Sequence, residues 1–211
     1  MGKASSCVIL CGGEVLCYKS AAKKIPPGAF IICADSGYNH CEKLSVKPDL
    51  LVGDFDSIGE IPAGIPAITL PAEKDYTDTY IAAMEALRMN FSEVVFIGIG
   101  GGRPDHTIAN LQTMARLSRA GLRVSAADGK SEMFMLTAPG KLTVPKREGC
   151  LFSVFAFSDI CRGVCISGAK YALDRYDLSF DDPRAVSNEF ADTNPVVTLE
   201  EGTMLVAVTL R

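Results

Sequence analysis

Lys47-Pro-Asp-Leu-Leu-Val-Gly-Asp-Phe-Asp-Ser57 joins a short apolar run to two closely spaced carboxylates. Leu50–Val52 suits a short strand buried on both faces, as in a parallel sheet. Asp54 and Asp56 follow this run, and open parallel sheets bind ligands beyond the carboxyl ends of their strands. A spacing of two places both carboxylates on one side of an extended chain, and paired oxygen ligands of this kind suit Mg²⁺. The alternative is an ordinary turn, because Asp and Gly are common turn residues.

The composition is that of a globular protein able to build a core. The chain has 211 residues, of which 48% are hydrophobic and 22% charged, both typical of folded domains. Its formal charge of -4 argues against a general nucleic-acid-binding protein, whose surface would be basic. We find neither a signal-peptide-like apolar run nor a segment long enough to span a membrane. The eight cysteines are therefore expected to be reduced thiols of a cytoplasmic protein.

Short apolar runs alternate with helix-like stretches from the start of the chain to about Asp128. This alternation predicts an α/β domain with a mostly parallel sheet of about six strands. The expected strands are Cys7–Cys11, Phe30–Ala34, Leu50–Val52, Ala67–Leu70, Val94–Ile99 and Arg123–Ala127.

The pattern changes after Pro139 to closely spaced β-type runs separated by Gly and Pro. No amphipathic helix of useful length interrupts them, which predicts an all-β sandwich. The expected strands are Leu142–Val144, Leu151–Phe157, Val164–Ser167, Val196–Leu199 and Met204–Leu210. We therefore expect two domains, residues 1–129 and 130–211.

Polar residues also follow other predicted strands. Asp35 ends the second strand, where its alternative role is to cap the following helix. Lys74, Asp75 and Asp78 precede a helix whose predicted apolar positions are Tyr80, Ala83, Met84 and Leu87. A cap requires one acidic residue at most, so it leaves the second carboxylate and Lys74 unexplained.

The fifth strand runs into Gly100-Gly101-Gly102-Arg103-Pro104-Asp105-His106. Glycines before a helix let backbone N–H groups approach a phosphate, and the helix dipole favours the anion. The alternative is a tight turn with Pro104 at the first helical position. Arg103 favours a phosphate site, because a guanidinium binds phosphate oxygens bidentately. The helix itself is expected to carry Ile108, Leu111 and Ala115 on its apolar face.

Taken together, these blocks resemble the thiamine pyrophosphokinase family in content and order. The matching segments are Ala34–Gly37, Lys47–Ser57, Lys74–Asp78 and Gly101–His106, followed in the C-terminal half by Gly168–Tyr171 and Ser187–Glu189. The resemblance implies transfer of a pyrophosphoryl group from ATP to the hydroxyl of thiamine, giving thiamine diphosphate and AMP. It also implies a catalytic α/β domain, a thiamine-binding β-sandwich and a homodimer with active sites between subunits.

The resemblance further implies roles for individual residues. Asp54, Asp56 and Asp78 correspond to the acidic cluster that holds Mg²⁺, and with Asp75 they are the candidate catalytic residues. The residues that correspond to nucleotide or phosphate contacts are Asp35, Lys74, Asp75, Arg103 and Asp105. Ser187 and Asn188 match the segment that contacts thiamine in the family. Some members stack the thiamine pyrimidine on a tryptophan, but this chain has none, so Tyr171 or a phenylalanine of the β domain is expected instead.

Two other classes of protein remain open at this point. A metal-dependent phosphohydrolase or another nucleotide pyrophosphokinase could use the same acidic edge. A non-catalytic thiamine-binding or nucleotide-binding protein is the third possibility, although it would need no cluster of carboxylates. Several like charges within a few ångströms repel one another unless a cation lies among them, which favours the Mg²⁺-dependent enzymes.

Overall fold

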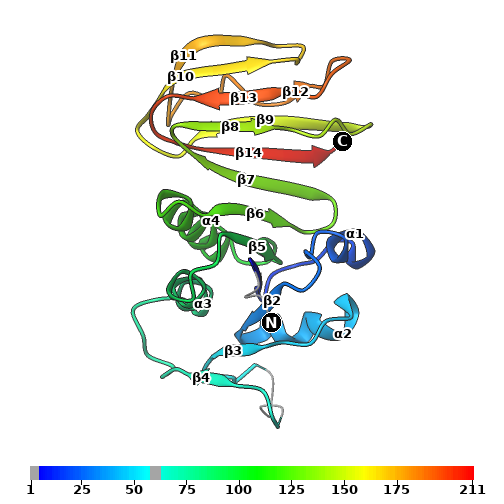
Figure 1. Ribbon diagram of the computed structural model, residues 1–211, viewed down its shortest axis with the longest axis vertical. Helices are drawn as coiled ribbons and strands as arrows, with labels where there is room; N and C mark the ends of the chain where they lie inside the picture. The colour runs from blue at the N-terminus through cyan, green and yellow to red at the C-terminus, as the bar shows by residue number, and fades with distance from the viewer. Residues whose placement is uncertain (1–4, 58–62) are drawn as a thin grey trace. The chain divides into compact units, whose positions relative to one another are not determined.

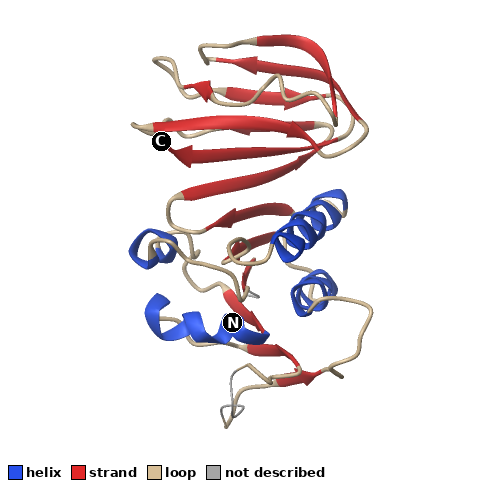
Figure 2. Ribbon diagram, turned by 180° about the vertical axis from the view of Figure 1, so that it is seen from behind, coloured by secondary structure: helices blue, strands red, loops and turns tan. Residues whose placement is uncertain are grey.

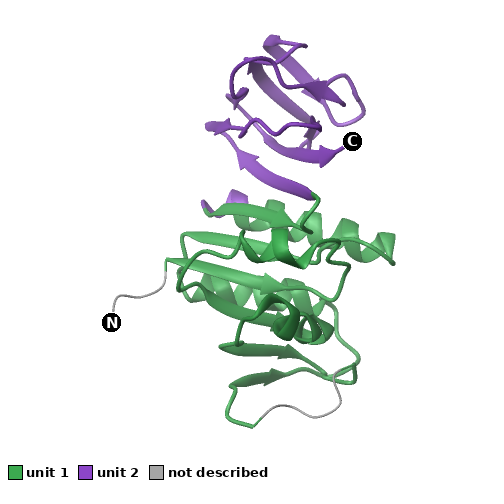
Figure 3. Ribbon diagram, turned by 90° about the vertical axis from the view of Figure 1, so that its right-hand side faces the viewer, with its two compact units in different colours: residues 1–117, 122–130 green, residues 118–121, 131–211 purple. Residues whose placement is uncertain are grey.

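The computed structural model describes residues 5–57 and 63–211. The chain forms two compact units (Figure 3). The first contains residues 1–117 and 122–130, and the second contains residues 118–121 and 131–211. The predicted plan of an α/β domain followed by an all-β domain is confirmed.

The N-terminal unit contains a parallel sheet. Its strands are β1 (Ser6–Leu10), β2 (Phe30–Ala34), β3 (Leu50–Gly53), β4 (Ala67–Thr69), β5 (Glu93–Ile97) and β6 (Arg123–Ala127). They lie in the order β6-β5-β1-β2-β3-β4, and each neighbouring pair is parallel. β1 therefore has β2 on one side and β5 on the other. The strand order reverses at this point, and parallel sheets commonly bind ligands there.

Helices cover both faces of this sheet. They are α1 (Tyr18–Ala22), the 3₁₀ helix η1 (Asp35–His40), α2 (Cys41–Leu44), α3 (Asp78–Arg88) and α4 (Pro104–Arg119). α3 and α4 lie on one side of the sheet, whereas α1 and α2 lie on the other (Figures 1 and 2). The core beneath α1 and α2 includes Val8, Leu10, Cys33, Leu51 and Ile97.

The predicted apolar faces of α3 and α4 need correction. The buried positions of α3 are Thr79, Ala82, Ala83 and Ala86. Of the predicted apolar positions, Ala83 is buried, whereas Tyr80, Met84 and Leu87 are half-buried. Small side chains let a helix approach a sheet closely, and the larger residues lie at the edges of the contact. In α4, Ile108 was wrongly placed on the buried face, because it is 57% exposed.

The C-terminal unit is a sandwich of two antiparallel sheets. Its strands are β7 (Ser131–Thr137), β8 (Gly140–Thr143), β9 (Cys150–Ala156), β10 (Ile160–Ser167), β11 (Leu173–Ser179), β12 (Asn188–Glu189), β13 (Val196–Leu199) and β14 (Thr203–Leu210). Within this unit the sheets have the orders β12-β9-β14-β7 and β11-β10-β13-β8. Side chains from both sheets, such as Val154, Ile166, Val197 and Val206, form one core. The sequence analysis missed β7, β11 and β12.

Among the residues that the structure describes, no helix is both long and apolar enough to cross a membrane. All eight cysteines are free thiols.

Candidate active site

The loops that follow the parallel strands meet at one edge of the N-terminal sheet. β2, β3 and β4 are neighbours, with Ala34 paired to Val52 and Gly53 paired to Thr69. Parallel strands have their carboxyl ends at the same edge. The chain segments after these strands therefore leave the sheet side by side, and they carry most of the predicted acidic residues.

Asp35 does not cap the helix that it begins. No side chain caps η1, and Asp35 has a φ of 45° in the left-handed region, where residues other than Gly are uncommon. Its Oδ1 atom is buried and has no hydrogen-bond partner among residues 5–57 and 63–211. A buried carboxylate oxygen without a partner costs free energy, so it marks a position where a ligand would stabilise the protein.

The loop after β3 turns two carboxylates toward Asp35. Gly53 leaves room for this approach, since a Cβ there would lie 3.0 Å from the Cβ of Asp35. Phe55 has a φ of 64° and is buried in the core, while its neighbours Asp54 and Asp56 stay at the surface. We had expected an extended chain at Asp54–Asp56, but the chain is not extended here. The buried Phe55 instead anchors a turn that presents both carboxylates.

Asp35, Asp54 and Asp56 form a cluster that fits a divalent cation. Each offers a carboxylate oxygen, and these three atoms lie within 4.8 Å of one another. Such a cluster of hard oxygen ligands, including one orphaned oxygen, suits Mg²⁺. The predicted ligand set contained Asp78 rather than Asp35. The roles of these residues remain predictions, but the geometry favours Asp35 as the third member.

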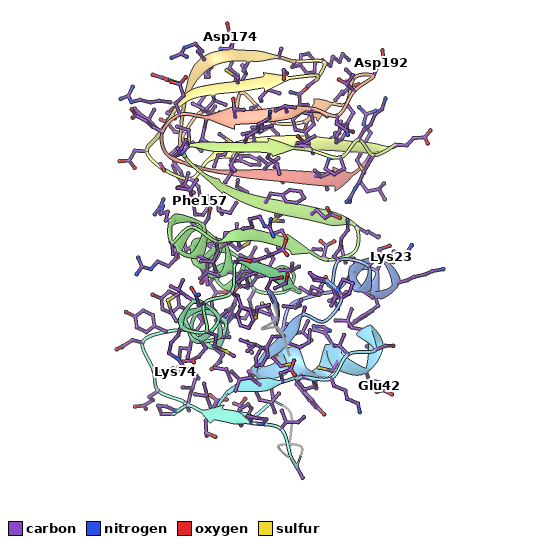
Figure 4. The ribbon with its side chains drawn as sticks, in the orientation of Figure 1. Lys23, Glu42, Lys74, Phe157, Asp174 and Asp192 are labelled. Atoms are coloured by element: carbon purple, nitrogen blue, oxygen red, sulfur yellow. The ribbon has the colours of Figure 1, made fainter. Side chains whose placement is uncertain are left out.

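Lys74, which is labelled in Figure 4, connects this cluster to α3. Its Nζ donates a hydrogen bond to Asp54 Oδ2 at 3.1 Å and lies 3.1 Å from Asp78 Oδ1. The second contact is ionic, because Asp78 Oδ1 has no well-directed hydrogen bond from the described residues. Thr77 is the helix cap, and its side chain accepts a hydrogen bond from Tyr80 N at 3.2 Å. Asp75 and Asp78 are therefore not needed as caps.

The two carboxylates beside Lys74 differ in their electrostatics. The hydrogen bond from Lys74 lowers the pKa of Asp54. Burial raises the pKa of Asp78, and the charges of Asp35 and Asp54 raise it further, although Lys74 opposes both effects. Burial by itself would lower the pKa of Lys74, but its two acidic partners outweigh that effect and raise it. The ammonium group of Lys74 thus faces several carboxylates, so a further cation would be needed to balance their negative charge.

Two glycine-rich loops form the other wall of the site. Gly13 N donates to Gly98 O at 2.9 Å, which ties the loop after β1 to the loop after β5. Pro104 begins α4, as the turn interpretation predicted. Arg103 donates to both carboxylate oxygens of Asp105, at 3.3 and 2.6 Å, and this contact raises the pKa of the guanidinium and lowers that of the carboxyl group. Both side chains are exposed, so Arg103 is free to turn toward an anion.

The loops that carry Asp35, Lys74 and Arg103 line a polar cavity of about 580 Å³. Asp54 and Asp56 are not part of this lining and adjoin it through their cluster with Asp35. The lining includes the predicted residues Asp35, Lys74, Asp75, Asp78 and Arg103. It also includes Tyr76 and Asn110, which sequence reasoning missed. Asn110 is 5% exposed and donates from Nδ2 to Ile99 O at 2.8 Å. Asn110 follows His106 by one turn of α4, so the spacing in the sequence could have placed both residues on the same face of the helix.

The predicted thiamine-binding residues come together in the C-terminal unit. Asn188 is 2% exposed, and its Oδ1 accepts hydrogen bonds from Tyr171 N and Glu189 N at 3.1 and 2.9 Å. Its Nδ2 donates to Tyr171 O at 2.7 Å. Asn188 therefore holds the backbone of two segments, and this side chain is a structural clamp.

A second cavity of about 270 Å³ adjoins this clamp. Tyr171, Arg184 and Asn188 contribute to its wall, together with aliphatic side chains. Tyr171 is 57% exposed, with Lys170 Nζ 5.3 Å from its ring centroid. Ser187 is exposed and has a φ of 59°, and its N donates to Ser153 Oγ at 3.0 Å.

Comparison with known protein families matches both units. Residues 23–126 match the family model for the thiamin pyrophosphokinase catalytic domain. Residues 141–204 match the model for the thiamin pyrophosphokinase vitamin B1 binding domain. A thiamine pyrophosphokinase of Bacillus subtilis (strain 168) is 28% identical over 160 residues, which cover 72% of this chain and 74% of that protein.

Solved structures show the same fold. The crystal structure of a Bacillus subtilis thiamine pyrophosphokinase matches with a TM-score of 0.86 and 23% identity, over 97% of this chain and 99% of that one. A Candida albicans thiamin pyrophosphokinase matches with a TM-score of 0.75 and 15% identity, over 99% of this chain and 90% of that one. The two family models together account for most of the residues, and the chain belongs to the thiamin pyrophosphokinase family.

Proposed function

We propose that the polar cavity of the N-terminal unit binds the triphosphate of ATP together with Mg²⁺. The protein is an enzyme of the thiamine pyrophosphokinase type. Its reaction transfers a pyrophosphoryl group from ATP to the hydroxyl of thiamine and gives thiamine diphosphate and AMP. The observation that carries the assignment of the cavity is the cluster of Asp35, Asp54 and Asp56, in which one buried oxygen has no hydrogen-bond partner among the described residues.

The carboxylates of this cluster are the proposed metal ligands. Bound there, Mg²⁺ would supply positive charge to the phosphate oxygens, which is its usual role in phosphoryl transfer. Lys74 adds a further cation at the edge of the cluster. Arg103 is the proposed partner of the phosphate oxygens that remain, since its present partner Asp105 is exposed and easily exchanged. These contacts position the transferred group and neutralise its charge.

Asp78 is our candidate for the group that accepts the proton of the thiamine hydroxyl. Burial raises its pKa, and a carboxylate with a raised pKa is a stronger base than an ordinary aspartate. The carboxylate also lines the cavity. With Asp35 completing the metal cluster, Asp78 is available for this role.

The C-terminal unit is the proposed source of further thiamine contacts. Its match to a vitamin B1 binding domain supports this assignment, with Tyr171 and Ser187 as contacting residues and Asn188 as the clamp that positions Tyr171. We also propose a homodimer with active sites between subunits, as the family resemblance implies. Light scattering tests the oligomeric state, and loss of specific activity on dilution tests whether the subunits share the sites.

The central experiment incubates the purified protein with ATP, MgCl₂ and thiamine and identifies the products by chromatography. We expect AMP and thiamine diphosphate in equal amounts, with none formed when EDTA replaces MgCl₂. Release of phosphate or AMP at the same rate without thiamine would instead indicate a phosphohydrolase.

A second experiment distinguishes the two possible metal sets. The affinity for Mn²⁺, a spectroscopic substitute for Mg²⁺, is measured in Asp35→Asn and Asp78→Asn. If Asp35 is the third ligand, Asp35→Asn weakens Mn²⁺ binding by about tenfold or more, whereas Asp78→Asn lowers turnover with little change in Mn²⁺ affinity. The reverse pattern would restore Asp78 to the metal site.

A further inference from the structure

An exposed pair of stacked tyrosines lies at the wall of the polar cavity. Tyr76 is 58% exposed and lines the cavity. Its ring stacks on that of Tyr80, with centroids 4.6 Å apart and an interplanar angle of 16°. Tyr80 belongs to the first turn of α3, and its backbone N–H is held by the helix cap Thr77. The start of the helix therefore fixes the ring of Tyr76, although most of its surface remains open.

Surface packing alone does not explain this arrangement. An exposed aromatic pair can simply protect the end of a helix, and a stack of this kind stabilises by about 0.5–1.5 kcal/mol. Tyr76, however, lies in sequence between Lys74, which contacts Asp54 of the acidic cluster, and Asp78, the first residue of α3 and the second partner of Lys74. A large flat ring at this point faces the space where the substrates react. Aromatic side chains at such positions commonly hold substrate rings.

The chemistry of the two substrates indicates which ring is bound. The thiazolium ring of thiamine is joined to the reacting hydroxyl by two carbon atoms, whereas the ribose and the α-phosphate separate adenine from the transferred group. A ring on Tyr76 would lie close to the phosphate site, which fits thiazolium better than adenine. Thiazolium is also a cation, and the face of a phenol ring attracts cations. The carboxylate of the exposed neighbour Asp75 adds to this attraction.

We propose that Tyr76, supported by Tyr80, stacks on the thiazolium ring of thiamine and helps to select this substrate. The proposal rests on the assignment of the cavity given above. It supplies an aromatic contact in a chain that has no tryptophan, and it does so from the N-terminal unit, where the sequence analysis expected none.

The test compares Tyr76→Ala, Tyr76→Phe and wild type in steady-state kinetics with each substrate varied in turn. Loss of a cation–π contact raises the KM for thiamine by about threefold to thirtyfold in Tyr76→Ala. The KM for ATP stays within about twofold, and kcat changes little, because the lost contact is made equally before and during reaction. Tyr76→Phe keeps the ring and retains a KM for thiamine within about twofold of wild type. Leu210→Ala serves as the control, since Leu210 is 52% exposed and lines neither cavity described above.

An unchanged KM for thiamine in Tyr76→Ala would overturn the proposal, as would an increase confined to ATP. Calorimetric titration with thiamine alone checks the same point without turnover, and it should show a similar loss of affinity in Tyr76→Ala. A failure of the proposed function can be told apart from a failure of the Tyr76 proposal, because wild type itself would then form no thiamine diphosphate.

Discussion

The polar side chains at the two cavities differ in how fully their hydrogen bonds and charges are satisfied. In the N-terminal unit, carboxylates gather around Lys74, and a buried oxygen of Asp35 has no hydrogen-bond partner in the part of the chain that the structure describes. In the C-terminal unit, Asn188 is buried, and its amide makes three hydrogen bonds to backbone groups. Unsatisfied charges indicate a place that a ligand completes, whereas satisfied amides indicate architecture. Substitutions in the first cavity should therefore mainly affect activity, and those at Asn188 should mainly affect stability.

The largest expected effect concerns the metal cluster. Asp54→Asn and Asp56→Asn each remove a charged ligand but keep the shape of the side chain. We expect the rate of thiamine diphosphate formation to fall by about 10²- to 10³-fold in each. The free energy of unfolding should change little, because the Asp54–Lys74 pair is partly exposed.

Quantifying thiamine diphosphate and following urea denaturation test the two halves of this prediction. Asp192→Asn, at an exposed site in the C-terminal unit (Figure 4), is the control and should behave as wild type. Near-normal turnover in both metal-cluster variants would contradict the assignment of the first cavity.

The next effect in size is on stability and concerns the clamp. Asn188→Ala leaves the backbone groups of Tyr171 and Glu189 without their partners, which should lower the free energy of unfolding by about 2–3 kcal/mol. Urea denaturation measures the loss. Asn188→Asp keeps one acceptor but buries a carboxylate whose second oxygen faces Tyr171 O, so its loss at neutral pH should be at least as large. Equal stability of Asn188→Ala and wild type would mean that the two cavities do not differ as we describe.

The acidic edge of the sheet was predictable from the sequence, but its detailed grouping was not. Asp35, Asp54 and Asp56 each follow an apolar strand run, and the rule for parallel strands places them at one edge. The order of the strands is not visible in the sequence. Because β2 lies directly beside β3, Asp35 joins Asp54 and Asp56, and Asp78 reaches the cluster only through Lys74.

The conformation at Phe55 had no signal in the sequence. A bulky residue with positive φ is uncommon, and the expected extended chain would have placed Phe55 opposite its acidic neighbours. The burial of Phe55 in the core stabilises the turn instead. Tertiary packing thus determined the local geometry, so both carboxylates lie near Asp35 although the chain is not extended as their spacing had suggested.

The missed strands show the same limit. β7 contains Glu132, which is 7% exposed and paired with Arg147, so a charge interrupts its apolar pattern. β11 pairs only with β10 at the edge of its sheet, and Leu178 is its one buried residue. Its charged residues resemble a loop. A search for alternating apolar residues cannot find strands of either kind.

A smaller effect separates the clamp from the substrate contact next to it. Ser187→Ala removes an exposed hydroxyl group but keeps the backbone bond to Ser153. We expect the KM for thiamine to rise about fivefold and the KM for ATP to stay unchanged, since the lost contact is on one side only. Stability should remain close to that of wild type. Equal changes in both KM values would show that Ser187 does not contact thiamine.

The smallest effect concerns a satisfied network within the N-terminal unit. His40 Nε2 lies 2.9 Å from Gly13 O, and Nδ1 lies 2.8 Å from the hydroxyl of Tyr18. A carbonyl only accepts, so Nε2 carries the proton, and the neutral ring accepts from Tyr18 at Nδ1. Burial lowers the pKa of His40, and the cation of Lys43 lowers it further, although the bond to Gly13 opposes both.

The sign of the pH dependence follows from this lowered pKa. At a pH between the folded and unfolded pKa values of His40, the unfolded chain binds more protons than the folded chain. The contribution of His40 to stability is therefore present above about pH 6.5 and is lost as the pH falls through the folded pKa. His40→Gln keeps a donor and an acceptor but does not titrate. Urea denaturation at pH 7.5 and pH 5.5 should therefore show a smaller loss of stability in His40→Gln than in wild type. The raised pKa of Asp78 acts in the opposite direction, but Asp78 is present in both proteins, so its effect cancels in the comparison. Identical losses of stability in the two proteins would mean that neutral His40 does not hold the Gly13 loop.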